Sequence, residues 1–199
     1  SIYGADGVLL DLEDSIALAE KDSARKLVRR ALGALEFGGV EKVVRINGRD
    51  TPFFEKDLAE IVPARPDAVR LPKVDGPEDV LEADRIISRL EKENGIEPGT
   101  VRIQAMLETA RAIVNAAAIA AASSRLSGLT LGGQDLAADL GIKATKDGRE
   151  LLYAKSAVVI AAKASGLEAF DTVFTDVNDL EGLLRSEERR VGKECRSRW

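Results

Sequence analysis

Residues 103–108 read IQAMLE, a short apolar run that ends in Glu108. The pattern returns at residues 129–135, LTLGGQD, where an apolar run leads to Asp135. Four more apolar runs end beside charged side chains, near positions 11, 45, 71 and 171. Because helical patterns separate these runs, we expect six parallel strands of one sheet. The charged ends should then share the carboxyl edge of that sheet, where α/β proteins build active sites.

Amphipathic helices are predicted between the apolar runs. In residues 21–36, apolar side chains recur at the spacing of a helix with one buried face. Pro77 suits the first turn of its helix, and Gly95 and Gly166 suit C-terminal caps. The other predicted helices are 54–62, 77–92, 109–123 and 151–165. The chain is therefore interpreted as about six βα units.

Two architectures fit this alternation, an open doubly wound sheet and a (β/α)₈ barrel. A complete barrel typically takes about 250 residues, so a barrel of this length would lack some of its units. Residues 185–199 (RSEERRVGKECRSRW) break the pattern, because they are dense in charge and hold the only Cys and the only Trp. We expect one domain in residues 1–184 and a non-native or disordered tail in residues 185–199.

The composition limits the classes of function. With 45% hydrophobic and 32% charged residues, the chain resembles an ordinary soluble globular protein. Its net charge of −5 argues against a nucleic-acid partner, and its single Cys fits a reducing, cytoplasmic compartment. No signal peptide opens the chain and no apolar run is long enough for a bilayer, so no membrane partner is expected. The absence of His excludes a Ser-His-Asp triad and a His-ligated zinc.

Glu108 and Asp135 are the candidate metal ligands. They lie one βα unit apart, and neighbouring strands are about 4.8 Å apart, so the two carboxylates can share one ion. Mg²⁺ is often held by one or two carboxylates together with water and substrate oxygens. The alternative is that both acids simply favour the positive ends of the helices that follow them.

Arg45 is the candidate clamp for a substrate carboxylate, which a guanidinium binds with two hydrogen bonds. The alternative is a salt bridge to a strand-end acid such as Glu13, and such a pair would also orient Arg45. Asp11, Glu13 and Asp14 form the densest acidic cluster and are candidates for a supporting ligand, a base or an anchor for Arg45. Alternatively, Asp14 or Ser15 caps the next helix.

Three other positions follow the same runs. Lys73 is favoured as an ion-pair partner over a Schiff-base lysine. Gly132 and Gly133 precede Asp135 and permit close approach of the backbone to a ligand. Asp171 has no assigned role.

In this order, six segments resemble the citrate lyase β subunit-like proteins of the HpcH/HpaI aldolase/citrate lyase superfamily. The resemblance covers roughly residues 5–184. Each motif alone is weak, but six in the same order and spacing are a specific signal. They are ADGVLLDLEDS (5–15), VRIN (44–47), LPKV (71–74), LETA (107–110), LGGQDL (131–136) and AFDTV (169–173).

The resemblance favours the barrel and implies a (β/α)₈ TIM barrel that is truncated here, with about six units and no first or last strand. It also implies a Mg²⁺-dependent carbon–carbon lyase that cleaves a citryl-type thioester to oxaloacetate and an acetyl thioester. Glu108 and Asp135 match the metal ligands, Arg45 the carboxylate clamp, and Glu13 and Asp14 the acidic motif beside them. Substrate contacts are implied for Arg45, Glu108, Asp135 and, through its backbone, Gly133.

The thioester carrier is either coenzyme A or an acyl-carrier protein, and the full-length form is expected to be a homo-oligomer. Three alternatives remain for the activity: a malyl-CoA or β-methylmalyl-CoA lyase, a thioester hydrolase of the same superfamily, and an inactive truncated fragment. The absence of His separates the chain from the hydroxy-keto-acid aldolase branch, which uses a His as its base.

Overall fold

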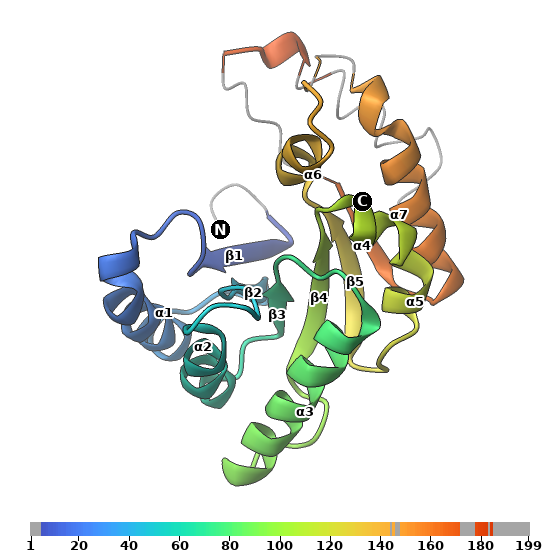
Figure 1. Cartoon of the computed structure of the whole chain (residues 1–199). Helices are drawn as coiled ribbons and strands as arrows, with labels where there is room; N and C mark the ends of the chain where they lie inside the picture. The colour runs from blue at the N-terminus through green and yellow to red at the C-terminus, as the bar shows by residue number, and fades with distance from the viewer. Residues whose placement is uncertain (1–4, 144, 146–147, 172–177, 183, 185–199) are drawn as a thin grey trace.

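A curled sheet of six parallel strands forms the centre of the computed structural model (Figure 1). The structure describes residues 5–143, 145, 148–171, 178–182 and 184. The strands neighbour one another in sequence order, which differs from a doubly wound sheet with its reversal of strand order. They are β1 (Gly7–Asp11), β2 (Glu41–Arg45), β3 (Ala68–Leu71), β4 (Arg102–Leu107), β5 (Leu126–Leu131) and β6 (Glu168–Phe170).

Helices cover the outer, convex face of this sheet, and α6 lies beyond the carboxyl end of β5 (Figure 1). They are α1 (Lys21–Ala34), α2 (Phe54–Ile61), α3 (Pro77–Glu93), α4 (Ala110–Val114), α5 (Ala116–Ala120), α6 (Gly133–Asp139) and α7 (Leu152–Ala164). Single 3₁₀ turns are η1 (Leu18–Glu20), η2 (Val62–Ala64) and η3 (Arg149–Leu151). The architecture is therefore an α/β half-barrel, with its helices on one side of the sheet.

The apolar core lies between the sheet and the helices. It includes Val69, Ile103 and Leu129 from the strands with Ile86 from α3 and Val158 from α7. Side chains alternate along a strand, so the residues between these core positions face the concave side. This core fixes the position of each strand relative to the helices, and so fixes where the carboxyl end of each strand lies.

The concave side carries polar groups even where it is buried. Arg70 donates from Nε and Nη2 to Gln104 Oε1 at 3.1 and 2.6 Å, and its guanidinium lies 5.4 Å from the centre of the Phe170 ring. Burial and, to a smaller extent, the charge of Arg45 lower the pKa of Arg70 to about 10. The inside of the half-barrel is thus lined by polar and charged groups below the strand ends.

Most of the predicted elements are confirmed. The six strands end where the apolar runs end, Pro77 opens α3, and Gly95 and Gly166 have the positive φ of C-terminal caps, 63° and 69°. The helix predicted at 109–123 is wrong as a single helix, because it is divided at Asn115, whose Nδ2 donates to the backbone oxygen of Asp75 at 2.8 Å.

Three details differ further from the sequence prediction. Helix α6 was not predicted, and α1 ends at Ala34. The capping role for Asp14 or Ser15 is wrong, since η1 and α1 begin after Ala17 and Glu20 without a side-chain cap. The tail predicted at 185–199 lies outside the described residues. Within the described part of the chain, no helix is long and apolar enough to cross a membrane.

Candidate metal and substrate site

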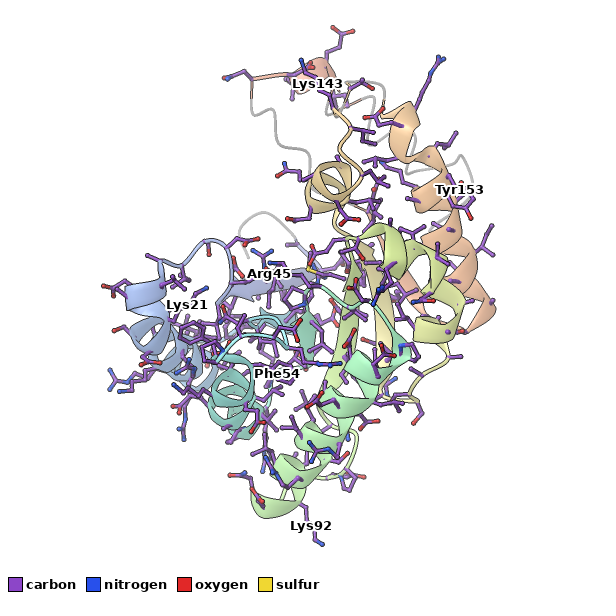
Figure 2. All side chains as sticks on the ribbon, viewed as in Figure 1. Lys21, Arg45, Phe54, Lys92, Lys143 and Tyr153 are labelled. Atoms are coloured by element: carbon purple, nitrogen blue, oxygen red, sulfur yellow. The ribbon has the colours of Figure 1, made fainter. Side chains whose placement is uncertain are left out.

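The charged side chains that follow the strands meet at the carboxyl edge of the half-barrel. Asp11 and Arg45 end β1 and β2 as register partners, and Figure 2 labels Arg45 at this edge. Lys73 lies two residues after the end of β3, Glu108 follows β4 directly, and Asp135 lies in the first turn of α6, just after β5. The core behind the strands therefore brings five separate segments of the sequence to one edge.

Arg45 is enclosed by three carboxylates. Its Nε donates to Asp11 Oδ1 at 2.7 Å and its Nη2 to Asp11 Oδ2 at 2.6 Å. Its Nη1 lies 3.0 Å from Glu13 Oε2 and 3.2 Å from Asp14 Oδ2. The predicted pairing of Arg45 with Glu13 is confirmed, and Asp11 is the stronger partner because it binds with both oxygens.

These contacts shift the pKa of both partners of the main pair. The hydrogen bond to Asp11 raises the pKa of Arg45 well above its usual range. Burial opposes ionisation of Asp11, but the bonds from Arg45 and from the N–H groups of Glu13 and Ser15 hold the pKa of Asp11 far below its usual range. Asp11 and Arg45 are therefore a permanently charged pair at neutral pH.

Glu13 differs from Asp11 in its charge state. It is 7% exposed, and burial raises its pKa to about 7, against the lowering effect of Arg45. The charge of Asp14 contributes to this raised pKa, while Lys73, whose Nζ lies 3.8 Å from Glu13 Oε1, opposes it. The predicted ion-pair role of Lys73 is confirmed by this contact. Glu13 is thus a buried carboxyl that can exchange a proton near neutral pH.

Glu108 is the most enclosed acid of the site, with 2% of its surface exposed. Its Oε1 accepts a hydrogen bond from the Lys73 backbone N–H at 2.6 Å. Burial, followed by the charges of Asp135 and Glu13, raises the pKa of Glu108 to about 7 against the lowering effect of the Lys73 N–H. Because all three acids act on one another, the edge has an excess of negative charge around Glu108.

That excess fits a bound cation, because an ion of opposite charge favours the ionised carboxylate. Among the residues that the structure describes, no group of three or more His, Cys, Asp or Glu side chains could hold a metal. Glu108 and Asp135 would therefore supply two ligands, and water and substrate oxygens the others, as Mg²⁺ commonly requires. Asp135 is exposed in the first turn of α6, so its helix-dipole interpretation fits as well.

Two other predicted positions, Gly133 and Asp171, lie in different surroundings. Gly133 is buried as the first residue of α6, on the strand-end side where Gly132 bonds to Leu107. Asp171 pairs with Lys155 of α7, with 3.0 Å between Oδ2 and Nζ, which assigns it a contact within the half-barrel wall.

Two residues that support the acidic cluster were not found by sequence reasoning. Lys21 Nζ donates to the backbone oxygens of Leu12 and Glu13 at 2.8 and 2.6 Å, and Figure 2 labels it at the start of α1. Asn47 Nδ2 donates to the same Leu12 oxygen at 3.0 Å and to Asp57 at 2.6 Å. For Asn47, the only sequence signal for this role was its position two residues after Arg45 in the VRIN segment.

Comparison with known proteins identifies relatives of this chain. The sequence model of the HpcH/HpaI aldolase/citrate lyase family matches residues 1–192. The citrate lyase subunit beta of Leuconostoc mesenteroides subsp. cremoris is 47% identical over 184 residues, which are 92% of this chain and 61% of that protein. The mitochondrial citramalyl-CoA lyase of Rattus norvegicus is 34% identical over 191 residues, covering 90% of this chain and 56% of its own length. The chain thus spans about three fifths of the curated relatives it matches.

A solved structure shows the same arrangement of elements. The citrate lyase beta subunit from M. tuberculosis complexed with oxaloacetate and magnesium superposes with a TM-score of 0.76 at 33% identity, over 94% of this chain and 78% of that one. The family match and this likeness confirm the resemblance read from the six segments. The chain therefore belongs to the HpcH/HpaI aldolase/citrate lyase family.

Proposed function

We propose that this chain carries the cation site and the carboxylate clamp of a Mg²⁺-dependent carbon–carbon lyase acting on a citryl-type thioester. The observation that carries the proposal is the position of Glu108 and Asp135 at the same strand-end edge as Arg45. Similarity to a citrate lyase subunit and to a structure complexed with oxaloacetate and magnesium supports it.

The fold supports a proposal about the architecture of the complete domain. We propose that the half-barrel is six units of a (β/α)₈ TIM barrel, with residues 1–184 as its domain and 185–199 as a tail that does not belong to it. The sequential strand order and the single helical layer are the features of one arc of such a barrel. A homo-oligomer remains a prediction for the complete enzyme.

Arg45 would bind a carboxylate of the substrate through Nη1. Its Nε and Nη2 are already directed to Asp11, so the substrate would compete with Glu13 and Asp14 for the remaining nitrogen. The incoming carboxylate would displace Glu13 from Nη1 and leave it as an ionised carboxylate that can accept a proton, because its pKa is about 7. This makes Glu13 the proposed proton carrier and Asp14 a more exposed member of the same cluster.

The proposed reaction is a retro-aldol cleavage. A bound Mg²⁺ would polarise, as a Lewis acid, the oxygen that becomes the keto oxygen of oxaloacetate. Glu13 accepts the proton of the substrate hydroxyl while the carbon–carbon bond breaks. The electron pair of that bond passes to the carbon beside the thioester, and Glu13 then returns the proton to this carbon, which gives the acetyl thioester and restores the Glu13 carboxylate. Atoms and charge therefore balance without an additional oxidant or reductant.

The test is a measurement of oxaloacetate release from citryl-CoA by the 199-residue chain, with Mg²⁺ and with a chelator. We expect turnover that needs the metal, and its loss in Glu108→Ala and in Asp135→Ala. Asp50→Asn is the control, because its side chain is 99% exposed and its removal takes one carboxylate from the surface. Full activity in the double Ala variant would contradict the metal assignment.

A panel of thioesters separates this proposal from its closest rivals. Similarity to citramalyl-CoA lyase favours the CoA esters of malate and its methylated relatives as the second class of substrate. Citryl, malyl and β-methylmalyl groups on CoA and on acyl-carrier protein would each be assayed for bond cleavage and for thioester hydrolysis. Absence of metal binding and of turnover with every ester would indicate the inactive fragment.

A further inference from the structure

We propose that Gly132 and the backbone of Lys73 are positioning elements that hold the Glu108 carboxylate from two sides, with Oε2 directed to the cation. This inference rests on the proposed function, because it concerns the same cation site. Lys73 contributes through its main chain, and Gly132 contributes because it has no side chain.

The first side is formed by Lys73. Its backbone has a φ of 54°, in the left-handed region that non-glycine residues seldom adopt. Its N–H donates to Glu108 Oε1 at 2.6 Å, whereas its side chain is 62% exposed, with Nζ 3.8 Å from Glu13. The next residue, Val74, donates its N–H to the Met106 oxygen at 3.2 Å, which fixes the loop to β4. Lys73 therefore contacts Glu108 through the main chain.

The second side is formed by Gly132. A Cβ at this position would lie 2.5 Å from Glu108 Cβ and 2.5 Å from Glu108 Oε2, which is far inside van der Waals contact. Gly132 has an ordinary φ of −89°, so glycine is required here for space rather than for backbone freedom. Its N–H donates to the Leu107 oxygen at 3.1 Å and its oxygen accepts from Leu136 at 2.9 Å, so the backbone is fixed on both sides.

The two contacts leave the two oxygens of Glu108 with different roles. Oε1 accepts the hydrogen bond from the Lys73 N–H, and Oε2 lies on the Gly132 side, where an added Cβ would be 2.5 Å from it. A carboxylate that is held in this way needs no reorganisation before it binds a cation. Groups that orient a ligand in this manner are typically worth about 10- to 100-fold in metal affinity.

Gly132→Ala tests the second side. We expect its Kd for Mg²⁺, measured by isothermal titration calorimetry, to rise about tenfold or more. Gly128→Ala, four residues earlier in β5, is the matched control, because its Cβ would lie 2.5 Å from Phe170 and its three nearest atoms belong to Phe170 and Glu168. Its Kd should stay within about threefold of the original. Equal weakening in both variants would indicate general damage to β5 and would overturn the proposal.

Two substitutions of Lys73 test the first side without depending on Gly132. Lys73→Gly and Lys73→Val both remove the ammonium group, but only Gly tolerates a positive φ. We expect the Gly variant to keep its Mg²⁺ affinity and the Val variant to lose about tenfold. Equal loss in both would assign the effect to the ammonium and overturn the backbone role.

A measurement without metal separates this inference from the proposed function. The Lys73 amide should exchange slowly with solvent by NMR, and Gly132→Ala should speed its exchange while Gly128→Ala leaves it unchanged. That result, in a chain that binds no Mg²⁺, would contradict the proposed function and support the positioning role. Unchanged exchange and unchanged Mg²⁺ affinity in Gly132→Ala would overturn the inference while the cation site stands.

Discussion

Asp11 binds the Arg45 guanidinium through two parallel hydrogen bonds, Nε to Oδ1 at 2.7 Å and Nη2 to Oδ2 at 2.6 Å. The two residues end neighbouring strands and are partners in the sheet register, so the pair also joins β1 to β2. Bidentate pairs of this kind combine strength with a defined orientation. The pair therefore directs the third nitrogen of Arg45, Nη1, toward Glu13, Asp14 and any carboxylate that competes with them.

Asp11→Asn should lower the free energy of unfolding by about 2 kcal/mol at pH 7, because it removes a partly buried, charge-assisted bond. The pKa of Asp11 is held below its ordinary value of 3.8, so its stabilising contribution is present above that value and is lost as the pH falls below it. Urea unfolding should show the difference between the two proteins at pH 7 and a smaller one at pH 3. A difference that grows at low pH would contradict the lowered pKa, and Asp50→Asn serves as the exposed control.

Glu108→Gln should stabilise the metal-free protein at pH 8. The folded pKa of Glu108 is about 7 against an ordinary 4.5, so the protonated form is favoured in the folded state. The resulting stability is complete below pH 4.5 and is lost as the pH rises through 7. Gln carries no charge and avoids this loss, which is worth on the order of 2 kcal/mol.

Thermal unfolding with and without Mg²⁺ checks this prediction. At pH 8, Mg²⁺ should raise the Tm of the original chain and leave that of Glu108→Gln almost unchanged, because a ligand stabilises only the state it binds. Glu93→Gln, at an exposed position of α3, is the control. A metal-free Gln variant that unfolds at a lower temperature than the original at pH 8 would argue against the raised pKa.

Strand positions could be predicted from the sequence, because a buried parallel strand requires apolar residues while its carboxyl end can carry a charged side chain. Each apolar run that ends in a charged residue therefore marks a strand and its end. Helix α6 could not, since its seven residues are too few for a hydrophobic period. The pairing of Arg45 with Glu13 was predicted, but the dominant partner is Asp11, because choosing among adjacent acids requires the strand twist and the side-chain rotamers. The left-handed Lys73 has no sequence signal, as lysine ordinarily avoids that conformation.

Lys21→Met should destabilise the protein by about 1–3 kcal/mol, because the Leu12 and Glu13 oxygens lose a buried donor. The acidic segment should also become less ordered, so the amide of Glu13 should exchange faster by NMR. Lys26→Met on the exposed face of α1 is the control, since it removes an ammonium from the same helix without such contacts. Equal exchange in both variants would show that Lys21 does not hold this segment.

Arg125→Met should cost about 3–5 kcal/mol of unfolding free energy, because it leaves a buried charge without its partner. Glu91 is fully buried in α3 and accepts from Arg125 Nη1 and Nη2 at 2.9 Å each, and from the N–H groups of Gly99 and Val101 at 3.0 and 2.9 Å. Glu91→Gln removes the charge and keeps one side-chain oxygen, which can accept from one of the two backbone donors. The double variant should therefore be more stable than Arg125→Met alone, as measured by urea unfolding, and a simple sum of the two single losses would show that the charges are not coupled.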